Sequence, residues 1–335
     1  MFRFDIVTIG SITFDIFLKG FKYDIVKNKK FISQKGLALD YSSKTGVDQL
    51  EYHSGGGALN TGVLFSNFGL KTAIISRLGN DFAAQIIRER IKECQKLDFS
   101  LLQTDDRFST AASCILVTGD GEKTILSYKG CGANLNEEEM PFSQIQTKVL
   151  YLGSASGNKN IIQKSFDYKK KNPFTILASN PGNKDLEILK KHPSWLKGYD
   201  IFIINQNEAA YLSDIPSKKE KQIFQWLIWH TNGICIITQG PKGLMAYDRK
   251  NIYHTGVYDV KVIDSTGAGD AFSAGFTAGY ILKNDIIYSL KLGLANASQV
   301  IQKIGANSNV LKPNDLNSQF WKKAFNQLKI TSERL

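Results

Sequence analysis

Apolar and polar positions alternate in a regular rhythm along the second half of the chain. Short runs of mostly β-branched and aliphatic residues are each followed by a stretch of helical period, at residues 149–152, 174–177, 200–204 and 234–238. This alternation is typical of parallel strands joined by crossover helices. The run 201–204 is apolar at every position, as expected of a strand that is covered on both faces. The pattern therefore predicts an α/β fold with a mostly parallel sheet.

Two segments depart from this rhythm. Residues from about 17 to 52 and from 111 to 128 have the pattern of antiparallel strands, and Thr118-Gly119-Asp120-Gly121 predicts a hairpin turn in the second segment. We expect the two segments to form one small β lid over the active edge of the main sheet, with bounds at about 17–54 and 109–130. Because no linker or repeat interrupts residues 1–335, the lid is expected to be an insertion in a single domain.

Composition and charge argue against several classes of protein. The chain has 335 residues, of which 42% are hydrophobic, enough for a large core. Its net charge of +11 is spread along the chain rather than gathered in one block, which indicates a lysine-rich solvated surface and not a nucleic-acid partner. The four cysteines are far apart and form no CxxC pair, so neither a zinc site nor a disulfide framework is predicted.

The start of the chain carries a charged residue, Asp5, within a strand-like segment, which does not fit a signal peptide. No uninterrupted apolar stretch is long enough to cross a bilayer. We therefore expect a cytoplasmic protein without a membrane partner.

The sharpest local motif is Asp264-Ser265-Thr266-Gly267-Ala268-Gly269-Asp270-Ala271-Phe272, which follows a strand-like segment at 259–263 and opens a helix. Small residues at a helix start let backbone N–H groups approach a phosphate closely. A carboxylate beside that phosphate would be repelled unless it had a task, such as accepting the proton of an attacking hydroxyl. The alternative is that Asp270 only stabilises the first helical turn and that the glycines form a tight turn.

A second glycine motif, Gly55-Gly56-Gly57-Ala58-Leu59-Asn60, precedes residues of helical period and a strand at 72–76. Bare backbone at the glycines allows a ligand to pack closely, and Asn60 offers a donor and an acceptor to a polyol. The alternative is a flexible turn without a ligand.

Together, these motifs resemble the paired signatures of the ribokinase-like, or PfkB, family of carbohydrate and nucleoside kinases. The resemblance extends over nearly the whole chain in the family's order. Three further segments match it: Arg77-Leu78-Gly79-Asn80-Asp81, Asn205-Gln206-Asn207-Glu208 and Thr238-Gln239-Gly240-Pro241-Lys242-Gly243. The resemblance implies a three-layer α/β/α sandwich with a central mostly parallel sheet and a small β-sheet lid. It also implies an ATP- and Mg²⁺-dependent kinase that phosphorylates a hydroxyl of a sugar or nucleoside.

The resemblance assigns roles to individual residues. Asp270 would be the base, and the amides of Gly267, Ala268 and Gly269 would form the anion hole. The implied substrate contacts are Asp15, Gly55, Gly56, Asn60 and Lys129. The implied nucleotide and magnesium contacts are Asn205, Glu208, Thr238, Gly240, Gly243 and Asn296, with Mg²⁺ held by Asn205 and Glu208 through water. A K⁺ site is expected at Asp264, Thr266 and 305–308.

Several of these residues have an alternative structural role. Asn205 and Glu208 have the spacing of a capping box at a helix start. Residues 238–243 could form a simple β-turn, Asp15 could cap a turn, and Lys129 could be an exposed lysine at the end of a strand.

Other readings of the whole protein remain. A dinucleotide-binding motif is disfavoured because Phe272 occupies the place of the third glycine. A non-catalytic sensor of the same fold, which binds a nucleotide or a sugar, is the alternative function. Because lids in this family often pair between subunits, a homodimer through the lid is expected. Ribose, a hexose, a keto-deoxy sugar acid and a nucleoside all stay open as substrates.

Overall fold

The computed structural model describes residues 2–31 and 34–335. Met1, together with Ile32 and Ser33 of the first predicted lid segment, lies outside the described residues.

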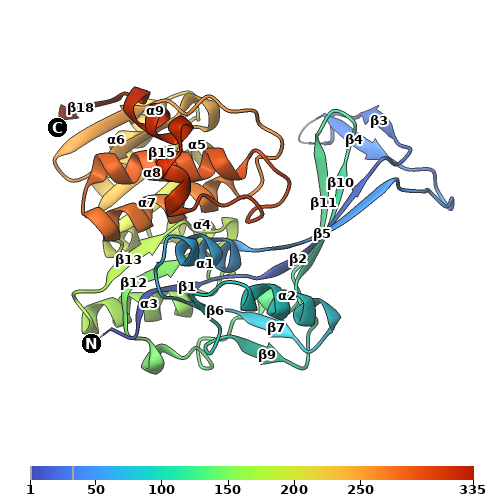
Figure 1. The fold of residues 1–335 in the computed structure, drawn as a ribbon, viewed down its shortest axis with the longest axis horizontal. Helices are drawn as coiled ribbons and strands as arrows, with labels where there is room; N and C mark the ends of the chain where they lie inside the picture. Colours follow the sequence, from blue (N-terminus) through green and yellow to red (C-terminus); the bar gives the residue numbers. More distant parts are fainter. Residues whose placement is uncertain (1, 32–33) are drawn as a thin grey trace.

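Ten strands form the main sheet, in the order β18-β17-β16-β15-β14-β13-β12-β1-β6-β8. Neighbouring strands from β8 to β15 are parallel, while β16, β17 and β18 continue the sheet in antiparallel pairing (Figure 1). The strands are β1 Phe4–Ile9, β6 Thr72–Ile75, β8 Leu97–Asp98, β12 Thr147–Leu152, β13 Ile176–Ser179, β14 Ile201–Asn205, β15 Ile234–Thr238, β16 Leu244–Tyr247, β17 Asn251–Thr255 and β18 Ile330–Arg334. The mostly parallel sheet that the hydrophobic rhythm predicts is therefore confirmed.

Helices cover both faces of this sheet. The helices are α1 Gly57–Asn67, α2 Phe82–Lys92, α3 Lys159–Lys171, α4 Asn183–Lys191, α5 Gln206–Ser213, α6 Glu220–His230, α7 Ala268–Lys283, α8 Ile286–Val300 and α9 Gln319–Gln327. Short 3-10 turns lie at Gly130–Ala133, Phe142–Gln144, Pro193–Gly198, Gly240–Lys242 and Pro313–Asn317.

The core is divided into two layers by the alternation of side chains along each strand. In β12, Leu150 and Leu152 join a cluster with α3, α4, α5 and α6, whereas Val149 and Tyr151 join a cluster with α1, α7, α8 and α9. Successive strand residues point to opposite faces, so a strand that is buried on both sides must be apolar throughout. The result is a helix–sheet–helix sandwich.

Two details of the predicted rhythm were wrong. The strand at 234–238 leads into an antiparallel strand and not into a helix, because Gly240 (φ 58°) and Gly243 (φ 98°) adopt backbone conformations that turn the chain back. The segment 259–263 is not a strand. Val262 and Ile263 are exposed there, and the chain is held by the amides of Ile263 and Asp264, which donate to the Ile301 carbonyl.

A separate four-stranded sheet projects away from the sandwich (Figure 1). Its order is β11-β10-β2-β5, with β2 Thr13–Lys19, β5 Gln49–Gly55, β10 Ala112–Val117 and β11 Lys123–Tyr128. The predicted hairpin is confirmed as β10 and β11, but β2 and β10 pair in parallel, so the sheet is not antiparallel throughout. We call these four strands the small sheet.

Two further pairs of strands lie outside both sheets. One is the hairpin of β3 Asp24–Lys27 and β4 Lys35–Ala38, and the other joins β7 Arg77–Gly79 to β9 Gln103–Asp105 in parallel.

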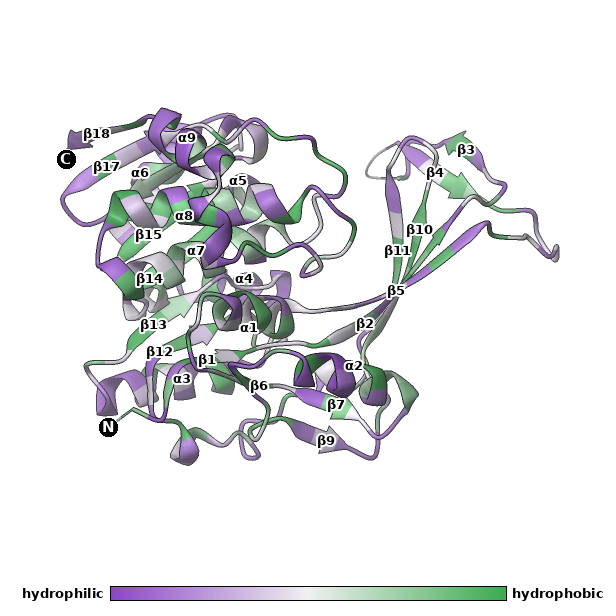
Figure 2. Cartoon of the chain, in the orientation of Figure 1, coloured by the Kyte–Doolittle hydropathy of each residue, from purple (hydrophilic) through white to green (hydrophobic). Residues whose placement is uncertain are grey.

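Apolar residues continue from the sandwich onto the small sheet (Figure 2). Exposed members are Leu50, Tyr52, Ile125, Leu126 and Tyr128. Within residues 2–31 and 34–335, none of the helices has the length and apolar character required to span a bilayer.

Candidate active site

The start of α7 forms one wall of the candidate site. Gly267 precedes the helix with φ 78°, and a Cβ at this position would lie 2.4 Å from the Cβ of Ala306. Both the backbone conformation and the close approach therefore require glycine. The Ala268 amide donates to the Ser265 carbonyl at 3.2 Å, so one of the three predicted anion-hole donors already has a partner inside the protein.

Asp270, in the first turn of α7, is held by a chain of amide side chains. Asn60 Nδ2 donates to Asp270 Oδ2 at 2.8 Å, and Asn307 Nδ2 donates to Asn60 Oδ1 at 2.9 Å. Asn307 Nδ2 also donates to the Ser54 carbonyl at 2.9 Å. Because Asn307 supplies a donor to the Asn60 oxygen, the Asn60 nitrogen must face Asp270. The two glycine motifs thus meet at this carboxylate, although Asn60 and Asp270 are 210 residues apart in the sequence.

This position changes the titration of Asp270. Burial raises the pKa of Asp270 to about 6, against the opposing effect of the hydrogen bond from Asn60. The carboxylate is therefore ionised at neutral pH but close to the pH at which it gains a proton. Because the folded-state pKa of Asp270 lies above the ordinary value of 3.8, ionising this partly buried carboxyl group costs folding free energy above pH 6. Such a cost is expected at a functional site rather than in a structural core.

The glycine run connects Asp270 to a second carboxylate. A Cβ on Gly57 would lie 3.8 Å from Asp270 Oδ1, and a Cβ on Gly55 would lie 2.3 Å from Asp15 Oδ2. Gly56, between them, has φ 92° and passes close to the Ser11 carbonyl. Burial raises the pKa of Asp15 as well. The backbone of the glycine run therefore packs tightly against Asp15 at one end and approaches Asp270 at the other.

Asn205 and Glu208 form the capping box that their spacing predicts. Asn205 Oδ1 accepts from the amides of Asn207 and Glu208, each at 2.9 Å, and Glu208 Oε2 accepts from the Asn205 amide at 2.8 Å. Burial, and then the nearby charge of Asp270, raise the pKa of Glu208. The start of α5 therefore places a further carboxylate, that of Glu208, close to Asp270.

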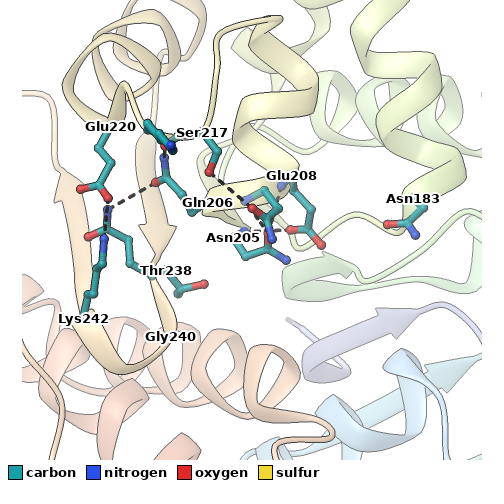
Figure 3. A pocket seen from close by; sticks show the side chains of 12 residues that line it. Asn183, Asn205, Gln206, Glu208, Ser217, Glu220, Thr238, Gly240 and Lys242 are labelled. Atoms are coloured by element: carbon teal, nitrogen blue, oxygen red, sulfur yellow. Dashed lines mark hydrogen bonds and ion pairs between the residues drawn. The ribbon is translucent and has the colours of Figure 1, made fainter. Parts of the chain in front are cut away.

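An open cleft of about 710 Å³ lies between α5 and the turn after β15. Figure 3 shows Asn205 and Glu208 on one side of this cleft, and Thr238 and Gly240 on the other. The cleft is polar, and its lining also includes Asn183 and Lys242.

A second cavity, of about 650 Å³, shares Thr238 and Gly240 with the polar cleft and is mainly apolar. It extends from Ala268 and Gly269 at the start of α7 toward the loop at 257–262. Its lining includes Gly243, Tyr258, Val260, Phe272, Leu294 and Ala297. The sequence motifs include Gly240, Gly243 and Phe272 of this lining, but not Tyr258, Val260, Leu294 and Ala297, because those four residues belong to no motif.

Two predicted site residues lie elsewhere. Asn296 is fully buried behind the apolar cavity, where its Nδ2 donates to the Ala271 carbonyl and its Oδ1 accepts from the Leu311 amide. Both ends of its side chain are thus engaged inside the protein, and its neighbour Ala297 lines the cavity instead. Lys129 is exposed at the start of a 3-10 turn, and it lines neither the polar cleft nor the apolar cavity.

The predicted K⁺ ligands are brought together, but around a lysine. Lys123 Nζ forms an ion pair with Asp264 and donates to Thr266 Oγ1 at 2.9 Å. Asp264 Oδ2 accepts from the Gly305 amide at 3.3 Å, and Ser308 Oγ donates to the Gly305 carbonyl at 2.9 Å. These oxygen atoms therefore do not fit a K⁺ ion while Lys123 is in place. The sequence analysis missed Lys123, and it included Asn307 only as part of a K⁺ site at 305–308 and not as a partner of Asn60.

Known proteins resemble this chain both in sequence and in fold. The pattern of the family described as "pfkB family carbohydrate kinase" matches residues 6–313. The ribokinase of Haemophilus influenzae is 24% identical over 264 residues, covering 76% of this chain and 83% of its own. The nucleoside kinase of Methanothermobacter thermautotrophicus is 24% identical over 275 residues, covering 80% of this chain and 85% of its own.

A solved structure supports the fold independently. The ribokinase of Arabidopsis thaliana, complexed with ribose and ATP, superposes with a TM-score of 0.76 at 18% identity, covering 94% of this chain and 97% of its own. The predicted ribokinase-like α/β/α sandwich is therefore confirmed. With a family match over nearly its whole length and the fold of a ribokinase, the chain belongs to the pfkB family of carbohydrate kinases.

Proposed function

We propose that this protein transfers the γ-phosphoryl group of ATP to a hydroxyl of a sugar or nucleoside, with Asp270 as general base. The observation that carries the proposal is the contact between Asn60 and Asp270. It brings the start of α7, which suits a phosphate, to the glycine run, which suits a polyol. The family match and the relatives named as ribokinase and nucleoside kinase support the same reaction class.

The acceptor would lie between the two carboxylates that border the glycine run. Asp15 would accept hydrogen bonds from substrate hydroxyls, and the backbone at Gly55 and Gly56 would allow close packing of the ring. Asn60 is only 4% exposed and donates to Asp270. We therefore propose that Asn60 orients the base, in place of the direct substrate contact that its motif suggests.

Asp270 would accept the proton of the attacking hydroxyl late in the reaction, when that oxygen has become acidic. The amides of Gly267 and Gly269, at the positive end of α7, would stabilise negative charge on the transferred group. The Ala268 amide would contribute less, because it also donates to Ser265. In-line transfer of this kind depends mainly on positioning and on charge stabilisation, and both are features of these elements.

The nucleotide would occupy the two connected cavities. The apolar cavity with Tyr258 and Phe272 suits a purine base, and the polar cleft with Thr238 and Gly240 suits the phosphates. Glu208 would hold Mg²⁺ through water, because its partly buried carboxylate lies near Asp270 and a bound cation would favour the charged forms of both groups. Magnesium commonly keeps several waters and neutralises the charge of bridged phosphates.

A screen of acceptors tests the proposed activity. ATP consumption and product mass would be measured with ATP and Mg²⁺ against ribose, hexoses, keto-deoxy sugar acids, sugar phosphates and nucleosides. We expect one chemical group of acceptors to be phosphorylated. If every acceptor fails while ATP still binds, the non-catalytic sensor of the same fold is the better description.

The raised pKa of Asp270 predicts an acid limb in the pH profile. Asp270 must be deprotonated to act as a base, so activity is lost as the pH falls through the folded-state pKa of about 6. Below that pH, kcat/KM is expected to fall about tenfold for each pH unit. Initial rates between pH 4.5 and 8.5 at saturating ATP would measure this, with the folded state followed by circular dichroism. A profile that stays flat down to pH 5 would contradict the role of Asp270.

We also propose that the small sheet closes over the acceptor and pairs with the same sheet of a second subunit. Leu50, Tyr52, Ile125, Leu126 and Tyr128 are exposed on it, which is unfavourable for an isolated surface and suits an apolar interface. Light scattering coupled to size exclusion is expected to give the mass of a dimer. A monomer at all concentrations would rule out the pairing.

A further inference from the structure

Lys123 joins the small sheet to the α7 motif. It begins β11, and its side chain is only 19% exposed. The ammonium group pairs with Asp264, donates to Thr266 Oγ1, and lies 5.6 Å from the ring centroid of Phe17 in β2. A lysine of the small sheet thus contacts the turn that precedes the proposed anion hole, where Asp264 lies 141 residues after Lys123 in the sequence.

Asp264 organises this turn from a buried position. It is 3% exposed, and its Oδ1 accepts from the Thr266 amide at 2.8 Å while its Oδ2 accepts from the Gly305 amide at 3.3 Å. Burial alone would raise the pKa of Asp264, but the hydrogen bonds and charge of Lys123, together with Thr266, outweigh it and hold that pKa below its ordinary value. A buried carboxylate without a cation is strongly destabilising, so this turn needs a positive charge.

The positive charge that the family resemblance assigned to K⁺ is therefore supplied by a side chain. Within residues 2–31 and 34–335, Lys123 is the one cationic side chain that pairs with Asp264. An ammonium group carries the same single charge as K⁺ and donates to the same kind of oxygen atoms. Two cations sharing Asp264 and Thr266 would repel each other, so occupancy by Lys123 excludes a metal ion from these ligands.

We propose that the ammonium group of Lys123 takes the place of the K⁺ ion that the resemblance implies, so that turnover needs no K⁺. The turn before the proposed anion hole is then ordered by a residue of the small sheet. This inference rests on the proposed phosphoryl transfer for its activity measurement. It also makes a prediction about cation binding that is independent of any acceptor.

The activity test compares salts of different cations. Initial rates of the wild-type enzyme would be measured in chloride salts of K⁺, NH₄⁺, Na⁺ and tetramethylammonium at equal ionic strength. We expect differences below about twofold, because screening is the same in each salt. Lys123→Met keeps the length of the side chain but removes its charge. Its rate in tetramethylammonium is expected to fall at least about tenfold and to recover in K⁺ or NH₄⁺.

The matched control is Lys19→Met. Lys19 lies on β2 of the same small sheet and pairs with Glu51 at 2.7 Å rather than with Asp264. Its removal is expected to leave the enzyme insensitive to the choice of cation. Activation of the wild type by K⁺ would overturn the proposal, and so would full activity of Lys123→Met in tetramethylammonium.

Thermal unfolding separates this inference from the proposed function. K⁺ should raise the unfolding midpoint of Lys123→Met by at least about 2 °C relative to tetramethylammonium, and leave the wild-type midpoint unchanged. This result would support the cation replacement even if no acceptor were phosphorylated. Equal midpoints for the variant in both salts would overturn it. If Lys123→Met fails to fold, the test uses the wild-type protein alone. An increase in its unfolding midpoint or rate with K⁺ would overturn the proposal, and equal values in all salts would support it.

Discussion

Replacing Asp270 with asparagine should reduce kcat at least about a hundredfold, the low end for loss of a general base. Asparagine keeps the shape of the side chain and can still accept the hydrogen bond from Asn60, but it cannot take a proton from the acceptor hydroxyl. The affinity for ATP should change little, because the polar cleft and the apolar cavity are built from other side chains. Steady-state rates and equilibrium titration with ATP would measure the two effects separately.

Asp285→Asn is a suitable control for this substitution. Asp285 caps α8 beyond the far end of α7, where its Oδ1 accepts from the Tyr288 amide at 2.9 Å. Asparagine caps helices about as well as aspartate, so the same change of charge should leave both stability and turnover near the wild-type values. Near-normal turnover of Asp270→Asn, beside an unchanged control, would remove Asp270 from its role as base.

Gly267→Ala should also reduce kcat by about a hundredfold, by displacing the donors at the start of α7. Its φ of 78° disfavours any residue with a side chain, and the added Cβ would meet Ala306 at 2.4 Å. Either the turn or the segment around Ala306 must move, and positioning errors of this size strongly slow phosphoryl transfer. Turnover and thermal unfolding should both be measured, since the strain also lowers stability.

The control for this substitution is Gly256→Ala. A Cβ at Gly256 meets no atom within 4 Å, and its backbone is outside the left-handed region. We expect wild-type turnover there. If Gly267→Ala retains normal kcat while its unfolding midpoint falls, Gly267 shapes the fold only, and the anion-hole assignment is wrong.

The sequence predicts the elements of this fold well wherever a local pattern determines them. The run 201–204 is buried on both faces, as its uniform apolar composition indicates, and the hairpin around Thr118-Gly119-Asp120-Gly121 forms where its turn residues lie. The prediction failed at 259–263, whose β-branched residues look like a strand. Strand formation needs a partner at a sheet edge, and this segment instead crosses outside the sheet toward α7.

The candidate site was predictable for residues that belong to motifs and not for those that act through distant contacts. Gly267 and Gly56 belong to glycine-rich motifs, and their positive φ angles in the structure explain why glycine occupies both positions. Lys123 belongs to no recognisable motif, and Asn307 was indicated only through the K⁺ site expected at 305–308. The contacts of both residues depend on partners 141 and 247 residues away. Asn60 shows the intermediate case, in which the motif located the residue but not the partner of its side chain.

The segment Arg77-Leu78-Gly79-Asn80-Asp81 matches the family pattern, but its side chains make structural contacts. Arg77 is buried and pairs with Asp105 at 3.0 Å, and Asp81 caps α2 by accepting from the Ala84 amide at 2.9 Å. Both side chains are therefore used inside the protein.

The Asn307–Asn60–Asp270 chain has a consequence for how the protein is made. A ribosome releases residue 60 well before residue 307, so the proposed base cannot be oriented in this way on a nascent polypeptide that still lacks residue 307. Until Asn307 has docked, Asn60 is free to rotate its amide and to present oxygen toward the carboxylate, which would repel it. The arrangement proposed for catalysis can thus form only after the segment that contains Asn307 has been synthesised.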